Sequence, residues 1–153
     1  MCVLHPGHYY KHNPISLPYE KRKRSTAYIK HTKGETYNYF MGGVNGGTHE
    51  AFYRLSHVCS ENIKKDLDRN CIAIYHDESH LNRFFHNEKI KILPPSFGFP
   101  EGSNIPFESY IIIRNKMKHG GKYFDKLPTT AYVQRIKRRI KELYRNILWI
   151  LNF

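Results

Sequence analysis

Two adjacent carboxylates, Asp77 and Glu78, are the residues in this sequence best placed to do chemistry. The apolar run at residues 71–74 is expected to form a buried strand before them, and Leu81 and Phe85 follow at helical spacing. Asp77 is therefore predicted to cap a helix, and Glu78 shares the inward face of that helix with Leu81. Glu78 is either a capping carboxylate without chemistry or a group held ionised by the helix dipole, ready to stabilise or attack a developing cation.

The histidines beside this pair raise the question of a metal site. His76 and His80 are four residues apart, as are the two zinc ligands of H-E-x-x-H, but here the glutamate is displaced and His76 lies at or before the predicted cap. The triplet His76-Asp77-Glu78 also matches the H-x-E of zinc deaminases, which needs a downstream P-C-x-x-C. No cysteine follows Cys71, so no metal site is predicted.

Length and composition favour one basic, folded domain. The chain has 153 residues, of which 40% are hydrophobic, and its net charge of +12 favours anionic partners such as phosphates, nucleic acid or acidic lipid. Its three cysteines lack C-x-x-C spacing, which indicates a reducing compartment. Neither a signal peptide nor an apolar run of ~18 residues is visible, so we expect a cytoplasmic protein, soluble or peripheral on the inner face of the membrane.

Strand-like runs alternate with amphipathic segments, which predicts an α/β fold. Strands are expected at residues 2–4, 37–41, 71–74, 90–93 and 110–113, the last of them buried. Thr48 is expected to cap a helix whose core-facing stripe consists of Phe52, Leu55, Cys59, Ile63 and Leu67. Glycine pairs at residues 42–43 and 46–47 follow the second strand and indicate close approach by a ligand or another backbone.

Two basic segments are candidates for an anionic partner. Residues 21–24 read Lys-Arg-Lys-Arg, which fits a solvated loop or, alternatively, a nuclear signal or nucleic-acid patch. Residues 129–152 are predicted to form a basic helix with the apolar face Val133, Ile136, Ile140, Leu143, Ile147 and Ile150. That face either docks on the core or lies in the interfacial plane of an anionic bilayer. A basic nucleic-acid-binding module is the alternative function from another class.

Four segments, in this order, together resemble glycosyltransferase family 6, which includes the blood-group A and B transferases and bacterial relatives. They are His5-Pro6-Gly7, then Tyr19-Glu20-Lys21-Arg22 with Ala27-Tyr28-Ile29, then Tyr39-Phe40-Met41-Gly42-Gly43-Val44-Asn45-Gly46-Gly47, and His76-Asp77-Glu78-Ser79-His80-Leu81-Asn82. The resemblance covers residues 5–118. The tail, with Ile111-Ile112-Ile113-Arg114, is more similar to the bacterial members than to the animal ones.

The resemblance implies the C-terminal portion of a GT-A fold, with a mixed sheet and flanking helices. It also implies transfer of N-acetylgalactosamine or galactose from a UDP-sugar to the 3-hydroxyl of a β-galactoside, with retention of configuration. In that reading Glu78 is the catalytic carboxylate and Asp77 holds the donor sugar. Met41, Gly42 and Gly43 line the donor pocket.

The resemblance assigns the acceptor and the diphosphate to other residues. His5 orients the acceptor galactose, and Tyr75 and Pro18 occupy acceptor-binding positions where the family usually has Trp and Thr. The resemblance assigns binding of the diphosphate to three cations in a basic tail, Arg114, Lys116 and Lys118.

The family's nucleotide-binding half, with its D-x-D or N-x-N metal motif, belongs upstream of His5. We therefore expect a chain truncated at its N-terminus and inactive by itself, made of a catalytic half (1–128) and a basic amphipathic helix (129–153). No cofactor is expected within it, and Mn²⁺ is not expected to be required if the protein is of the bacterial type. UDP-N-acetylgalactosamine or UDP-galactose, a β-galactoside glycan and an anionic membrane surface are the expected partners, and nucleic acid is not.

Overall fold

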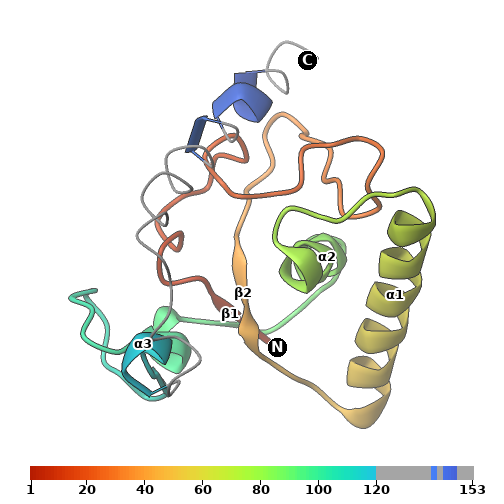
Figure 1. The fold of residues 1–153 in the computed structure, drawn as a ribbon. Coiled ribbons are helices and arrows are strands. Elements are labelled where there is room, and N and C mark those ends of the chain that lie inside the picture. Colours follow the sequence, from red (N-terminus) through yellow and green to blue (C-terminus); the bar gives the residue numbers. More distant parts are fainter. Residues whose placement is uncertain (120–138, 141–142, 148–153) are drawn as a thin grey trace.

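The computed structural model describes residues 1–119, 139–140 and 143–147 (Figure 1). Strand β1 (Cys2–Leu4) is the centre of the larger sheet, whose strand order is β2-β1-β3. It pairs antiparallel with β2 (Phe40–Asn45) and parallel with β3 (Ile92–Leu93), so the sheet is mixed. The predicted α/β class is confirmed.

Helix α1 (His49–Asp68) begins where the sequence predicts. The Thr48 side chain accepts a hydrogen bond from the backbone N–H of Ala51, which satisfies one of the free donors of the first turn. At the other end Asn70 adopts a left-handed conformation, with φ of 50°, and its N–H donates to the carbonyl of Leu67. The helix is therefore fixed at both ends by local chemistry.

Helix α2 (His76–His86) lies between β2 and α1 (Figure 1). Phe85 of this helix packs with Cys2, Phe40, Leu55 and Cys59 to form the main apolar core. A second cluster, Leu17, Tyr19, Ile29, Tyr37 and Tyr39, holds together the long connection between β1 and β2, which has no helix or strand of its own. Side-chain packing, mainly of tyrosines, therefore holds this connection in place where it has no helix or strand.

Residues 71–74 do not form the predicted buried strand. Cys71 and Ala73 are buried, but Ile72 is 58% exposed. The N–H of Cys71 donates to the carbonyl of Asp66, and the N–H of Ile74 donates to the Glu20 carboxylate at 2.8 Å. Because side chains and turns already satisfy these groups, the segment has no need of a neighbouring strand.

The start of α2 also differs from the prediction. Asp77 lies in the first turn, and the cap position belongs to Tyr75, which makes no side-chain capping bond. His76 has a φ of 50°, a conformation that non-glycine residues seldom adopt. This left-handed residue brings the chain sharply into the helix, so that Asp77 and Glu78 both lie in its positive first turn.

Three further predictions need correction. Strand β2 begins at Phe40, three residues later than expected, and includes the first glycine pair instead of ending before it. Of the stripe predicted for α1, Leu55 and Cys59 are buried, but Phe52 and Leu67 are 47% and 54% exposed, because only the middle of α1 packs on α2 and the sheet.

The predicted buried strand at residues 110–113 is instead the exposed strand β5 (Ile112–Ile113). It pairs only with β4 (Phe99–Pro100) in a separate sheet of two strands. Between β3 and β4 lies the 3-10 helix η1 (Pro95–Gly98), and the short helix α3 (Lys116–His119) follows β5. Most of the predicted last helix lies outside the described residues, but residues 139–140 and 143–147 are helical. Within the described part of the chain, no helix has the length and apolarity needed to cross a bilayer.

Candidate active site

The edge of β2 that faces away from β1 is covered by side chains of α2. Asn82 accepts a hydrogen bond from the N–H of Phe40 and donates to its carbonyl, both at 2.8 Å. One turn earlier, Glu78 accepts from the N–H of Gly42 at 2.7 Å. Four residues of helix rise about 6 Å and two residues of strand about 6.6 Å, so the two spacings match. Glu78 and Asn82 therefore act as a substitute strand, and Glu78 is fixed against the glycine pair.

The Glu78 carboxylate is held at both oxygens. Oε1 accepts a hydrogen bond from the Tyr39 hydroxyl at 2.8 Å, and Oε2 accepts from Gly42. Tyr39 is only 1% exposed, and burial together with the charge of Glu78 raises the pKa of its phenol far above the usual range. Tyr39 is therefore a permanent donor. An ionised carboxylate has about four lone-pair sites, so Glu78 keeps free lone pairs with its orientation fixed.

His5 lies beside this carboxylate as a neutral imidazole. Its Nδ1 accepts a hydrogen bond from the N–H of Gly7 at 3.0 Å, which leaves the proton on Nε2. Burial lowers the pKa of His5, although the charge of Glu78 opposes this. Its ring meets Tyr39 edge-on at 5.8 Å between centroids. His5 can thus offer a fixed N–H donor to a hydroxyl bound next to Glu78.

Tyr75 belongs to the same group, since its phenol is close enough to Tyr39 to raise the pKa of that residue further. The structure therefore brings together three residues predicted from sequence, His5, Tyr75 and Glu78. It adds Tyr39, which sequence reasoning missed as a site residue. Two signals in the sequence include Tyr39: the alternation of aromatic residues before the glycine pair, which predicts a strand, and the third family-like segment, which begins at Tyr39.

The three residues predicted to line the donor pocket follow one another in β2 but have different surroundings. A Cβ added to Gly42 would lie 3.3 Å from Oε2 of Glu78, so a side chain there would displace the carboxylate. Gly43 is exposed, and a Cβ there would meet only the Met41 methyl group at 3.5 Å, an ordinary contact. Met41 packs over Gly98, where a Cβ would lie 2.1 Å from its sulfur. Gly43 therefore borders open space, while Met41 is held by η1.

The Asp77 side chain does not face the site around Glu78. It is exposed and lines a pocket of about 390 Å³ with residues of α1, including Ile63 and Leu67. Its charge is felt by Cys59, whose pKa is raised to about 11, first by burial and then by Asp77. Neighbouring positions on a helix point about 100° apart, which separates this carboxylate from Glu78.

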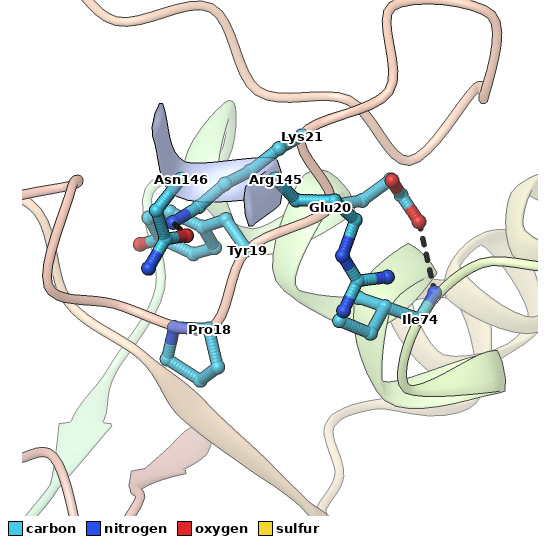
Figure 2. Close-up of a pocket in the computed structure, with 7 residues that line it drawn as sticks. All are labelled: Pro18, Tyr19, Glu20, Lys21, Ile74, Arg145 and Asn146. Carbon is cyan, nitrogen blue, oxygen red and sulfur yellow. Dashed lines mark hydrogen bonds between the residues drawn. The ribbon is translucent and has the colours of Figure 1, made fainter. Parts of the chain in front are cut away.

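Pro18 is buried in the long connection between β1 and β2. It lines a cavity of only about 10 Å³ with Tyr19, Glu20, Lys21, Ile74, Arg145 and Asn146 (Figure 2). That volume is about the size of one water molecule and leaves no room for a sugar ring. The three basic-tail residues lie at and after β5: Arg114 pairs with Glu101 at 3.8 Å, while Lys116 and Lys118 are exposed on α3.

The basic run at residues 21–24 is not a uniform cationic patch. Arg22 donates to both oxygens of Glu20, at 2.9 and 2.7 Å. Glu20 also accepts the N–H of Ile74 at 2.8 Å (Figure 2). The pKa of Glu20 is lowered, because these hydrogen bonds outweigh the opposing effect of burial. Arg22 thus anchors the segment that leads into α2, and of the predicted solvated loop Lys23 and Arg24 are exposed to solvent.

Across residues 1–119, 139–140 and 143–147, no three His, Cys, Asp or Glu side chains are grouped in a way that could hold an ion. His80 instead lies 3.8 Å from Asp66 in the interior, and burial lowers its pKa.

Burial lowers the pKa of four histidines, of which His5 and His8 lie at the site. The pKa of His8 is lowered to about 4, first by burial and then by the charges of His5 and Lys11. Burial is also the main cause of the lowered pKa of His5, His80 and His86. The unfolded chain takes up these protons near the ordinary histidine pKa of 6.5, whereas the folded chain does not. Between about pH 6.5 and 4, the unfolded state therefore binds more protons than the folded state.

We expect the free energy of unfolding to fall as the pH drops through this window. The ring of His8 contacts His5 and Tyr39. Replacing His8 with phenylalanine removes one group that only the unfolded chain protonates in this window, so the free energy of unfolding should depend less steeply on pH. Urea titrations at several pH values measure this slope. His57→Phe, at an exposed position of α1, is the matched control and should leave the slope unchanged. Equal slopes for the two variants would refute the assignment.

The geometry defines a class of protein before any relative is considered. A mixed α/β fold presents a carboxylate of fixed orientation beside a neutral imidazole donor and an open backbone surface at paired glycines. Such a site suits a reaction in which positive charge develops on a substrate bound next to Glu78.

Comparison with known proteins gives the family. Residues 1–118 match Glycosyltransferase family 6, so the chain belongs to this family, whose members have a GT-A type fold and use nucleotide-sugar donors and glycan acceptors. The resemblance predicted from sequence is confirmed.

Curated relatives include bacterial and animal enzymes. The chain is 38% identical over 116 residues to the O-antigen biosynthesis glycosyltransferase WbnI of Escherichia coli, covering 74% of this chain and 47% of that protein. It is 33% identical over 113 residues to globoside alpha-1,3-N-acetylgalactosaminyltransferase 1 of Gallus gallus, covering 73% of this chain and 32% of the relative. It is 37% identical over 98 residues to human alpha-1,3-galactosyltransferase 2, covering 63% and 28%. The chain thus spans less than half the length of these relatives.

Proposed function

We propose that this chain carries the catalytic and acceptor-binding residues of a retaining glycosyltransferase. The transferred sugar is N-acetylgalactosamine or galactose from a UDP-sugar, and the acceptor is the 3-hydroxyl of a β-galactoside in a surface glycan. The observation that supports this most is Glu78, held by Tyr39 and Gly42 within a segment that matches the family. Bound in this way, its free lone pairs can face a sugar without the side chain having to reorganise.

The reaction breaks the bond between C1 of the sugar and the diphosphate oxygen, and the bonding pair leaves with UDP. Retention follows if Glu78 either bonds transiently to C1 or stabilises the positive charge on one face while the acceptor oxygen attacks from the other side. The acceptor oxygen then forms the new bond to C1, and the departing phosphate takes its proton. Because UDP is a good leaving group, one carboxylate is sufficient, unlike the acid and base pair of glycosidases.

The remaining roles are proposed from the matched positions and from their surroundings. The Nε2–H of His5 would donate to a hydroxyl of the acceptor galactose, with Tyr75 beside it. Arg114, Lys116 and Lys118 would close on the diphosphate, and Arg114 would exchange Glu101 for that ligand. The matched position alone assigns the donor sugar to Asp77, because in this structure its side chain faces the pocket beside α1.

Gly43 supports N-acetylgalactosamine as the preferred donor sugar. The open space above Gly43 can take an acetamido group, which a side chain there would displace. Met41 argues mildly for galactose, but its side chain is turned toward Gly98.

A competition experiment tests the function. UDP-N-acetylgalactosamine and UDP-galactose are offered together with a β-galactoside. The assay uses the chain alone and a hybrid, in which residues 1–118 replace the matching part of the E. coli relative. The hybrid is included because the chain spans 47% of that relative. We expect α-linked N-acetylgalactosamine as the main product. A higher kcat/KM for UDP-galactose would contradict the donor assignment, and binding to generic DNA in place of UDP-sugar would contradict the function.

Gly42→Ala is expected to lower kcat of the hybrid by up to about ten-fold, because the new methyl group would lie 3.3 Å from Oε2 of Glu78 and the carboxylate would have to move by a few tenths of an ångström. Gly43→Ala is the matched control. Its methyl group touches only Met41, so kcat with UDP-galactose should change little, while the preference should shift away from UDP-N-acetylgalactosamine. Initial rates with both donors measure this difference. Equal losses of kcat with UDP-galactose in both variants would show that Glu78 is not the group disturbed.

A further inference from the structure

The C-terminal helical segment, defined here as residues 139–140 and 143–147, rests on the protein through its polar side. Arg145 and Asn146 are half-buried and line the small cavity beside Pro18 and Tyr19 (Figure 2). The ammonium group of Lys21 donates a hydrogen bond to the side-chain oxygen of Asn146. With only about 10 Å³ left between them, the two surfaces are in close contact.

The apolar side of the same segment faces away from the protein. Ile140, Leu143, Tyr144 and Ile147 are 62%, 61%, 61% and 46% exposed. Their spacing of three, one and three residues places them on one face, and Arg145 and Asn146 lie on the opposite face. The sequence left open whether this apolar face docks on the core. For the described residues it does not, since the helix is attached by its polar face.

The sequence around this exposed stripe is rich in basic residues. Residues 129–153 contain six basic residues, Arg135, Lys137, Arg138, Arg139, Lys141 and Arg145, against the single acidic residue Glu142. Arg139 is exposed. On the protein side, Lys21 belongs to the run of residues 21–24, in which Lys23 and Arg24 are exposed and Arg22 is occupied by Glu20. Apolar side chains flanked by basic ones are complementary to a surface that is apolar below and negatively charged above.

We propose that this stripe binds the chain to an anionic lipid bilayer, with the C-terminal helical segment lying in the interfacial plane. Ile140, Leu143 and Ile147 enter the boundary between headgroups and acyl chains. The exposed cations Arg139, Lys23 and Arg24 contact the anionic headgroups. Because Asn146 fixes the segment to the loop at residues 18–21, the membrane would hold the glycosyltransferase-like body in one orientation. This proposal is independent of the transfer reaction.

The full chain is sedimented with phosphatidylcholine vesicles and with vesicles of phosphatidylcholine and phosphatidylglycerol in equal parts. We expect binding to the anionic vesicles to be at least about ten-fold stronger, and this difference to shrink in high salt. Leu143→Asp should weaken binding to the anionic vesicles by roughly ten- to hundred-fold, because it removes one buried leucine and adds a repelled charge.

Leu67→Asp is the matched control, since Leu67 is an exposed leucine on helix α1 with 54% exposure, and it should leave vesicle binding unchanged. Circular dichroism of both variants checks that the fold is retained. Equal effects of the two substitutions, or equal binding to both kinds of vesicle, would overturn the proposal. So would concentration-dependent dimerisation without lipid that Leu143→Asp abolishes, because the stripe would then bind a second copy. Binding of duplex DNA that competes with vesicles and is insensitive to Leu143→Asp would also overturn it.

Discussion

Replacing Glu78 with glutamine is expected to lower kcat of the hybrid by about 10²–10³, which raises the activation barrier by ~3–4 kcal/mol. The substitution keeps the size of the side chain and removes the charge that opposes a cationic sugar. Glutamine can still accept a hydrogen bond at one position, so the attachment to Tyr39 and Gly42 is only partly lost. The Kd of the donor should change far less, because the uridine and phosphates make most of the contacts. Steady-state rates and donor titrations of the hybrid measure the two quantities.

Asp77→Asn is the comparison that separates the two adjacent carboxylates. Its side chain lies toward α1, away from Glu78, so its proposed role in holding the donor sugar rests on the matched family position alone. We therefore expect weaker donor binding together with slower turnover, in contrast to Glu78→Gln. If Glu78→Gln keeps turnover within a few-fold while Asp77→Asn abolishes it, the roles of the two residues are reversed.

Asn82→Ala is expected to lower the free energy of unfolding by about 3 kcal/mol. Asn82 is only 1% exposed, and its side chain satisfies both the N–H and the carbonyl of Phe40 and donates to the carbonyl of Glu78. Alanine leaves these buried groups unpaired, at about 1–3 kcal/mol each, with part of the loss relieved by local movement. Urea denaturation followed by circular dichroism measures the change.

Asn104→Ala, at an exposed loop position, is the matched control and should change stability by no more than about 0.5 kcal/mol. If the two asparagine variants were equally stable, α2 would not be attached to β2 by this side chain. The position of Glu78 would then need another explanation, since both residues bind the same strand edge from the same helix.

Local signals predicted the elements whose ends are fixed by their own residues. Thr48 marked the start of α1, and the short apolar run of β1 marked the central strand. The family segments placed His5, Tyr75 and Glu78 in one site, and the structure brings them together through Tyr39. These features depend on contacts between neighbours in sequence or on a pattern shared with relatives.

Contacts between distant residues account for the failures. Residues 71–74 have the composition of a strand, but their backbone is satisfied by Glu20 and by the end of α1, which no local pattern reveals. Tyr39 is a site residue only because α2 places Glu78 next to it, 39 positions along the chain. Likewise, the orientation of the C-terminal helical segment depends on Lys21 and Asn146, which are 125 positions apart.

The most direct test of the central claim is a proton NMR time course of the hybrid with an α-configured UDP-sugar and a β-galactoside, run in parallel for the parent and for Glu78→Gln. The coupling constant of the anomeric proton gives the configuration of the new linkage, and its intensity gives the rate. The account predicts an α-linked product from the parent and a rate lower by about 10²–10³ in the variant. A β-linked product, or an α-linked product formed as fast by Glu78→Gln as by the parent, would contradict it.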